Sequence, residues 1–436
     1  MEPRHARNQR PSPGRTTTVR FAMVVSACLI ILLAVVLAVL KPWEQQAPVV
    51  EGSEPEQSEQ PAQSAPQSEA QEPAPLEPLD FTISAGGDML IHMPVADSAW
   101  NGEKWDFSRL MEPVAPFIAG SDIALCNMET AMVPRDQAPS GYPIFGTPRD
   151  LADSMAATGW DGCSTSSNHS LDQGFAGVVN TIDFLEAAGL GHVGTARTAE
   201  EAQQPQLYTI EGNGQKVTVA HIAAAHNTNG LPIPEEAPWA IQMIDIPVIE
   251  ERARQARADG ADIVVATLHC CEAEYNTAAE PFQEETAAAL AASGLVDIYV
   301  AHHAHVPRPM ALLEGGPNGN GMWVAYGMGN FISNQTRDAT GSTESSTGMF
   351  GIFHGVKDEG EPARVVSAEW LAVTVDAGHV VRPLIGGVAE GAVLPEDEMA
   401  YRYSLMQQIL EGGPATEVAA PPSNEGHTTT VIQRGP

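Results

Sequence analysis

The chain has 436 residues, 43% of them hydrophobic and 18% charged, so it is long enough to bury a substantial core in one large domain or two ordinary ones. It contains 22 Lys and Arg residues against 55 Asp and Glu residues, a formal net charge of -33. Such an acidic chain is a poor partner for the phosphate backbone of nucleic acid. The five cysteines include no CxxC pair, which argues against a structural zinc site or a disulfide-stapled miniprotein. Any metal site must therefore rest on His and carboxylate side chains.

The N-terminal residues predict a membrane anchor. Five arginines and one acidic residue precede residues 21–40, which carry no charge at all. A helix of this length rises about 30 Å, the thickness of a hydrocarbon core, and the apolar stretch of a cleaved signal peptide is usually shorter. The arginines predict a single pass through the cell membrane, with residues 1–20 in the cytoplasm and everything after Lys41 outside the cell. The alternative is a long signal peptide that is removed.

The composition after the anchor separates one folded domain from two flanking segments. Residues 42–79 are rich in Pro, Gln, Glu, Ser and Ala, and residues 412–436 are similar. Such segments cannot bury enough apolar surface to offset their chain entropy. We therefore expect a disordered linker at 42–79, one large folded domain at 80–411 and a disordered tail at 412–436.

Within residues 80–411, short apolar runs rich in β-formers end in clusters of polar residues, and helical patterns often follow. Alternating strands and helices predict an α/β fold with parallel or mixed sheets, in which sites form at the carboxyl ends of strands. We expect these strand ends to meet at one site. The runs are FTISAGGD (81–88), DIALCNME (122–129), GWDGCSTSSNHSLD (159–172), KVTVAHIAAAHN (216–227), DIVVATLHCCEAE (262–274), VDIYVAHHAH (296–305) and MWVAYGMGNF (322–331).

The polar clusters have the chemistry of a metal site. Asp, Glu, Asn and His on separate strand ends are typical ligands of divalent transition ions, and a pair of ions about 4 Å apart needs a bridging carboxylate. Glu129 has the right type for that bridge, and His303 and His305 share one face of an extended segment. The alternatives are that Asp88 is a turn residue or helix cap, that Asn127 and Glu129 pair locally, and that the histidines lie in a solvated loop.

Six of these motifs together resemble one known family, the CapA family of bacterial capsule and poly-γ-glutamate synthesis proteins. The resemblance covers about residues 81–335, keeps the family's motif order and includes its plan of an N-terminal anchor before an extracytoplasmic domain. Departures are His269-Cys270-Cys271 where the family has His-Trp-Gly, and Ala301 in place of a glycine. The motifs are GGDML (86–90), NMET (127–130), SNHSLDQG (167–174), LHCCEAEY (268–275), AHHAHVPRP (301–309) and YGMGNFIS (326–333).

The resemblance implies a metallophosphoesterase-like fold, a four-layer αββα sandwich, with one or two divalent ions for which Mn, Fe and Zn are the candidates. It implies that His169 donates a proton to a leaving oxygen or holds phosphate, a role suited to imidazole. On the substrate side we expect Asn127, Glu274, Tyr275 and Asn330. The implied metal ligands are Asp88, Glu129, Asn168, His269, His303 and His305.

The implied function is the handling of poly-γ-glutamate or a related anionic surface polymer outside the membrane, with other capsule-export membrane proteins as partners. The sequence leaves open whether the chain is an enzyme and whether the polymer is made, transferred or cut. The acidic charge would repel a polyanion within a Debye length of about 8 Å. The alternatives are a secreted metal-dependent phosphoesterase or amide hydrolase, and a non-catalytic binding scaffold.

The cysteines outside the anchor raise a separate question. Cys126 and Cys163 each stand just inside a predicted strand end, where they either pair across neighbouring strands or remain buried thiols. Of these two interpretations we favour buried thiols. Cys270 and Cys271 are adjacent and point to opposite faces of a strand, so we assign them no redox role.

Overall fold

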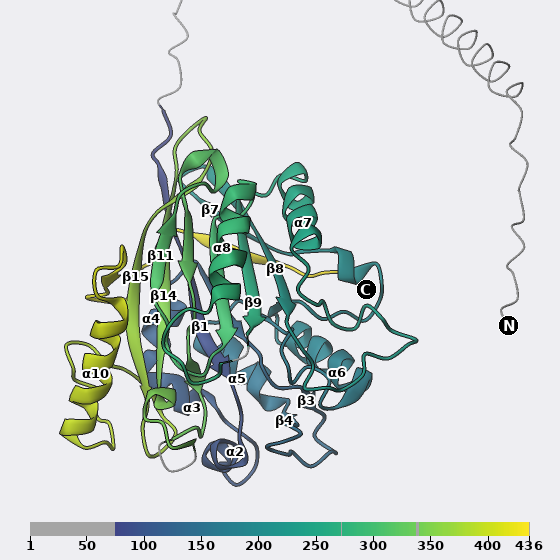
Figure 1. Cartoon of the computed structure of the whole chain (residues 1–436), viewed down its shortest axis with the longest axis vertical. Coiled ribbons are helices and arrows are strands. Elements are labelled where there is room, and N and C mark those ends of the chain that lie inside the picture. The colour runs from purple at the N-terminus through teal and green to yellow at the C-terminus, as the bar shows by residue number, and fades with distance from the viewer. Residues whose placement is uncertain (1–74, 272, 337–339, 436) are drawn as a thin grey trace, which may run out of the picture. The chain divides into compact units, whose positions relative to one another are not determined.

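Two β-sheets with helices on their outer faces form the part of the chain that the computed structural model describes, residues 75–271, 273–336 and 340–435 (Figure 1). The predicted cytoplasmic segment 1–20, the predicted anchor 21–40 and the linker as far as residue 74 lie outside the described residues. Among the residues described, no helix combines the length and the apolar character that a membrane crossing requires.

The first sheet is mixed. Its strand β1 runs parallel to β2 and to β13 and antiparallel to β14, and β14 and β15 form a long antiparallel pair. In spatial order the strands are β16 (Val381–Pro383), β15 (Arg364–Val375), β14 (Thr347–Lys357), β1 (Leu79–Met89), β2 (Ile123–Asn127), β5 (Gly162–Ser164) and β6 (Gly191–Val193), with β13 (Asn330–Ile332) beside β1 and β17 (Thr416–Glu417) beside β15.

The second sheet is also mixed, with a parallel centre and antiparallel edges. In spatial order its strands are β11 (Met310–Leu313), β12 (Met322–Ala325), β10 (Ile298–His303), β9 (Ile263–Cys270), β8 (Gln215–Ala225), β7 (Gln206–Gly212) and β18 (Thr428–Ile432). A separate small pair consists of β3 (Met132–Val133) and β4 (Thr147–Pro148). The two mixed sheets confirm the predicted α/β class.

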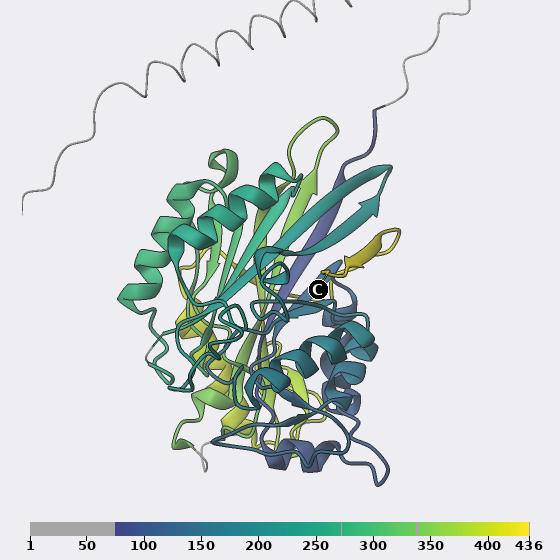
Figure 2. The same cartoon turned by 90° about the vertical axis from the view of Figure 1, so that its right-hand side faces the viewer.

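The helices are mostly short and amphipathic, and Figure 2 shows the green and the blue helices on opposite sides of the strands. The predicted helical stretch after residue 173 forms α6. The α-helices are α2 (Met93–Ala99), α3 (Ser108–Met111), α4 (Ala115–Ala119), α5 (Asp150–Thr158), α6 (Gly174–Ala187), α7 (Ile246–Ala258), α8 (Pro281–Ser293) and α10 (Glu396–Leu410). Short 3-10 helices cover Glu112–Val114, Glu201–Gln203, Pro317–Gly319 and Glu344–Ser346.

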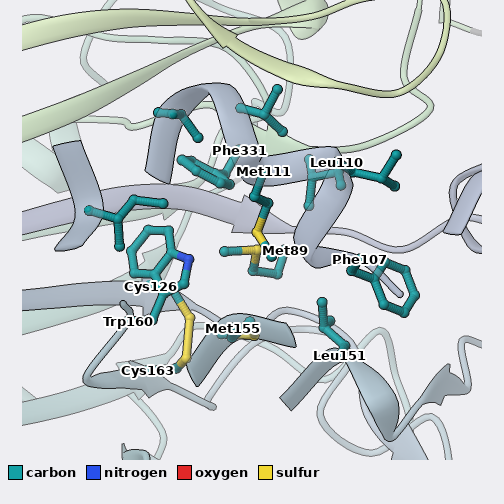
Figure 3. Close-up of a cluster of buried hydrophobic side chains, with 14 of the residues drawn as sticks. Met89, Phe107, Leu110, Met111, Cys126, Leu151, Met155, Trp160, Cys163 and Phe331 are labelled. Carbon is teal, nitrogen blue, oxygen red and sulfur yellow. A yellow bond between two sulfur atoms is a disulfide. The ribbon is translucent and has the colours of Figure 1, made fainter. Parts of the chain in front are cut away.

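Hydrophobic clusters hold the layers together. One cluster lies between the two sheets, where side chains such as Ile83 and Val219 come from opposite sheets. A second lies between the first sheet and helices α2 to α5, and Figure 3 shows Met89 and Trp160 within it. A third joins the second sheet to α7 and α8. The layers therefore lie in the order helices, first sheet, second sheet, helices. The strand ends of the two sheets meet at one edge of this arrangement.

The structure corrects the prediction of a disordered tail at 412–436. Strand β18 pairs antiparallel with β7 along its whole length, and Arg434 is buried, where it donates to the backbone carbonyl oxygens of His192 and Glu201. The composition is that of a linker, but edge pairing with a sheet that is already formed fixes the segment.

The structure also corrects the expectation of buried thiols at Cys126 and Cys163. These residues stand opposite one another on β2 and β5 and form a disulfide, with Cα atoms 4.5 Å apart (Figure 3). Cys270 and Cys271 are free and buried.

Candidate metal centre

The polar strand ends of both sheets converge, as the sequence predicts. In the first sheet, parallel pairing sets Asp88 of β1 opposite both Asn127 of β2 and Asn330 of β13. In the second sheet, His269 of β9 stands opposite His302 of β10. Parallel strands end at the same edge, so these side chains from distant parts of the chain are brought into one buried cluster.

Two carboxylates form the heart of this cluster. Asp88 and Glu129 are fully buried, and with His305 they offer ligand atoms that all lie within 4.8 Å of one another. One oxygen of Asp88, Oδ1, accepts hydrogen bonds from Asn127 Nδ2 at 2.9 Å and His302 Nδ1 at 3.0 Å. Nδ1 of His305 lies 3.3 Å from Oδ2 of Asp88, and its Nε2 lies 3.8 Å from Oε1 of Glu129. Among the described residues, neither oxygen of Glu129 accepts a hydrogen bond. Buried carboxylate oxygens left in this way fit a bound cation, because an uncompensated buried charge is costly.

Burial and close charges perturb the pKa values of these three groups. Burial alone would raise the pKa of Asp88, but hydrogen bonds from His302 and His305 hold that pKa well below its usual range. Burial raises the pKa of Glu129 well above its usual range. Burial lowers the pKa of His305, but the charges of Glu129 and Asp88 outweigh it and raise the pKa to about 9. The two carboxylates therefore stabilise a positive charge on their neighbour His305.

Two further histidines stay neutral, which is the form that binds metal. Burial lowers the pKa of His269 well below its usual value and that of His303 to about 4. His269 Nε2 lies 2.9 Å from Oδ1 of Asn168. The Nδ1 atom of His303 has no hydrogen-bond partner among the described residues, and its φ of 81° lies in the left-handed region. Such backbone strain at a non-glycine residue is often kept at functional sites.

His169 belongs to a pair that the sequence did not single out. Its Nδ1 lies 2.7 Å from Oδ2 of Asp172, and the backbone N–H of Phe145 donates to the same oxygen at 2.7 Å. A buried carboxylate in this position fixes the proton on Nδ1 and leaves Nε2 to exchange a proton with a substrate. Nδ2 of Asn229 lies 3.4 Å from Nε2.

One cleft of about 640 Å³ opens onto the cluster. Among the predicted site residues, Asn168, His169, Glu274, Tyr275 and His305 reach its wall. The remaining lining residues are Leu90, His92, Tyr142, Pro143, Ile144, Phe145, Asn229, Leu231, Asn334, Gln335 and Thr340. The volume is typical of small-molecule sites.

The other predicted residues lie behind the cleft wall. Asn127 and Asn330, which we expected on the substrate side, are almost completely buried and do not line the cleft. Asn127 instead donates to Asp88, and Oδ1 of Asn330 lies 3.2 Å from Nδ1 of His305. Both asparagines therefore orient candidate ligands.

Sequence reasoning missed three residues of this site as functional groups. His302 and Asp172 were visible within the predicted polar clusters, and the spacing of three between His169 and Asp172 was the available signal. Asn229 follows β8 in a loop and had no signal, because only tertiary structure brings it to within 3.3 Å of Asn168.

A second group of possible ligands, Glu186, His192 and Glu201, also lies close together. Here a cation is already present, since Nη2 of Arg197 lies 2.6 Å from Glu186 Oε1 and 2.7 Å from Glu201 Oε1. This group is therefore an ion-pair network that ties α6 to the following loop.

Together, two packed mixed sheets and a buried cluster of carboxylates and imidazoles at their shared rim define an α/β protein with a candidate divalent-metal centre. By sequence, the chain belongs to the family described as bacterial capsule synthesis protein PGA_cap, whose model matches residues 82–335. The resemblance to the CapA family is thereby confirmed.

Individual relatives are distant. A probable polyglutamine synthesis accessory protein of Mycobacterium tuberculosis is 24% identical over 276 residues, which cover 60% of this chain and 68% of the relative. The PGA biosynthesis protein CapA of Bacillus subtilis is 31% identical over 191 residues, which cover 40% of this chain and 44% of the relative.

Solved structures resemble the chain only loosely. The calcineurin-like phosphoesterase YfkN of Bacillus subtilis is 16% identical at a TM-score of 0.42, with 76% of this chain and 98% of that chain covered. The NAD nucleotidase of Haemophilus influenzae is 11% identical at a TM-score of 0.42, with 79% and 65% covered.

Proposed function

We propose that this chain is a metal-dependent capsule-assembly protein that transfers or cuts poly-γ-glutamate, or a related anionic surface polymer, outside the cell membrane. The observation that carries the proposal is the buried Asp88, Glu129 and His305 cluster. Its candidate ligand atoms all lie within 4.8 Å of one another, and neither Glu129 oxygen accepts a hydrogen bond from the described residues. Family membership and the names of the relatives support the choice of polymer.

The proposed centre holds one or two divalent ions, with Mn, Fe or Zn as the candidates. Carboxylate and imidazole ligands suit these metals. A bound ion would supply Lewis acidity toward a carbonyl or phosphoryl oxygen. The proposed ligands are Asp88, Glu129, Asn168, His269, His303 and His305.

The chain's own groups position these ligands and move the proton. Asn127 and His302 fix Oδ1 of Asp88, so Oδ2, which lies 3.3 Å from Nδ1 of His305, is the oxygen that would hold an ion. Asp172 accepts from Nδ1 of His169 and directs Nε2 toward the cleft. When the ring carries protons on both nitrogens, it can give the Nε2 proton to a leaving amine or alkoxide and keep the Nδ1 proton. General acid catalysis of this kind contributes about 10²–10⁴-fold to a rate.

The proposed location follows from residues 1–40. The arginine-rich segment and the apolar residues 21–40 would hold the protein in the cell membrane, with residues 42–79 as the proposed linker to the folded domain. Membrane proteins that export the polymer would then meet it at the same surface. Two fusions of the full chain test this location, one with a reporter before residue 1 and one with the reporter after residue 436. Only the reporter after residue 436 should be accessible from outside the cell.

A second candidate function is a metal-dependent phosphoesterase or amide hydrolase that acts on a small substrate. Two observations favour it: the net charge of -33 repels a polyanion, and the cleft wall, as far as it is described, carries no Lys or Arg.

One experiment separates these functions. The full chain in detergent, loaded with Mn²⁺, is incubated with poly-γ-glutamate and, separately, with a chromogenic phosphodiester. We expect the polymer to change in length and new amine ends to appear, and a chelator to abolish both. Turnover of the phosphodiester alone would favour the second candidate, and turnover of neither would overturn the proposed catalysis and leave a binding scaffold.

A further inference from the structure

The cleft wall has an unusual balance of charge for a protein that handles an anionic polymer. Glu274 is its one carboxylate, and no Lys or Arg is among its described lining residues. Within the described chain, Glu274 forms no ion pair with a basic side chain of Lys or Arg. A single anionic group can bind at the metal centre, but further carboxylates of a polymer would find no cationic partner along this wall.

Glu274 lies directly beside the candidate centre. Its backbone carbonyl oxygen accepts a hydrogen bond from the backbone N–H of His305 at 2.8 Å. Glu274 and His305 both line the cleft, so a positive group of the substrate that meets Glu274 would lie on the same wall as a proposed metal ligand.

Aromatic rings complete this part of the cleft. Tyr275 is 44% exposed, and its ring centroid lies 6.0 Å from that of His305. Tyr142 is 78% exposed, and its ring centroid lies 6.5 Å from that of Phe145. Exposed aromatic faces beside a carboxylate attract ammonium groups through the ring quadrupole.

The segment that carries Glu274 and Tyr275 is fixed from beneath by Arg308, which is fully buried. The Arg308 guanidinium donates to the backbone carbonyl oxygens of Ala273 at 2.6 Å and Asn276 at 2.8 Å, one on each side of the pair. The backbone that carries the carboxylate and the ring is therefore held in place before a ligand binds, which lowers the entropy cost of binding.

We propose that the cleft recognises a free ammonium group next to the reacting carbonyl or phosphoryl group, with Glu274 as its counter-charge and Tyr275 as its aromatic wall. The preferred substrate is then the amino end of a chain rather than its interior. This inference rests on the proposed function and names the substrate class of the same site.

Isothermal titration calorimetry tests the proposal with the full chain in detergent. The probes are a γ-glutamyl dipeptide with a free α-amino group and its N-acetylated form, each with Mn²⁺ and with a chelator. The wild type should bind the free amine roughly tenfold more tightly than the acetylated probe. Glu274→Gln should lose this preference, while Glu285→Gln, an exposed change of the same charge on α8, should keep it.

Equal binding of the two probes, binding of neither, or a preference that survives in Glu274→Gln would overturn the ammonium subsite. Failure of the proposed function can be distinguished from failure of the ammonium subsite. The proposed function requires bound metal, whereas the subsite predicts a difference in affinity between the two probes. A preserved preference in a protein that takes up no metal would refute the metal centre alone.

Discussion

Oδ2 of Asp172 lies 2.7 Å from Nδ1 of His169 and also accepts a hydrogen bond from the backbone N–H of Phe145. One buried carboxylate thus fixes both the imidazole that faces the cleft and a residue of the cleft wall. Imidazoles held in this way keep the proton on Nδ1 and react through Nε2.

The first prediction concerns this pair. Asp172→Asn should lower kcat by about 10²–10⁴-fold, because the amide no longer favours the reactive tautomer of His169. KM and metal content should stay near the wild-type values, since neither residue is a proposed ligand. The measurement is steady-state kinetics on whichever substrate the chain turns over, with elemental analysis of the same sample; an unchanged kcat would remove His169 from the mechanism.

Arg308 provides a prediction about stability. Its guanidinium is fully buried and bonds to Gln283, Glu280 and two backbone carbonyls. Arg308→Ala should lower the free energy of unfolding by about 3–5 kcal/mol, because it removes a buried guanidinium that bonds to all four of these acceptors. Arg364→Ala, which breaks a half-exposed ion pair with Asp358, should cost less than about 1 kcal/mol. Denaturant titration measures both, and similar losses would contradict this account of Arg308.

The disulfide between Cys126 and Cys163 closes a loop with a sequence separation of 37. A Cys126→Ala, Cys163→Ala double variant should lose about 2–4 kcal/mol of unfolding free energy, mainly through a less constrained unfolded chain. Peptide mapping of the denatured, unreduced chain checks the bond itself. It should recover residues 126 and 163 in one linked peptide pair, and recovery of both as free thiols would refute the pairing.

Asp161 predicts a pH dependence of stability. Burial, with a smaller contribution from the charge of Asp122, raises the pKa of Asp161 from 3.8 to about 7. Because the folded state binds this proton more tightly than the unfolded state, protonation of Asp161 adds to the free energy of unfolding. That contribution is complete below about pH 4 and is lost as the pH rises through 7.

Asp161→Asn keeps an oxygen that can accept from the Ala124 N–H but cannot ionise. Between pH 4 and 7 the free energy of unfolding should fall by on the order of 1–3 kcal/mol less in Asp161→Asn than in the wild type. The exposed Asp136→Asn should follow the wild-type curve. Thermal or denaturant unfolding across this range measures the difference, and parallel curves for all three proteins would rule out the raised pKa.

The convergence of the polar strand ends was predictable from the sequence. Apolar strands that end in Asp88, Asn127 and His269 were recognisable because buried strands have a strong hydrophobic signal and parallel strands end together. The pairing of His302 with Asp88 was not predictable, since the orientation of neighbouring histidines at a strand end depends on the local backbone, here with φ of 81° at His303.

The tail and the disulfide escaped prediction for a different reason. The sequence around strand β18 is polar and has the composition of a linker, and the strand forms because it pairs with β7. The bond between Cys126 and Cys163 depends on the register of β2 against β5. Both are tertiary properties that no local pattern encodes.

The most direct test of the metal centre is elemental analysis of the purified full chain beside two variants, Glu129→Ala and Glu186→Ala. Glu129 lies in the proposed centre, whereas Glu186 belongs to the group of possible ligands that Arg197 already neutralises. We predict one or two Mn, Fe or Zn ions per chain in the wild type and in Glu186→Ala, and loss of metal in Glu129→Ala with its circular dichroism unchanged. A wild type that takes up no metal after reconstitution, or a Glu129→Ala variant with full metal content, would contradict the account.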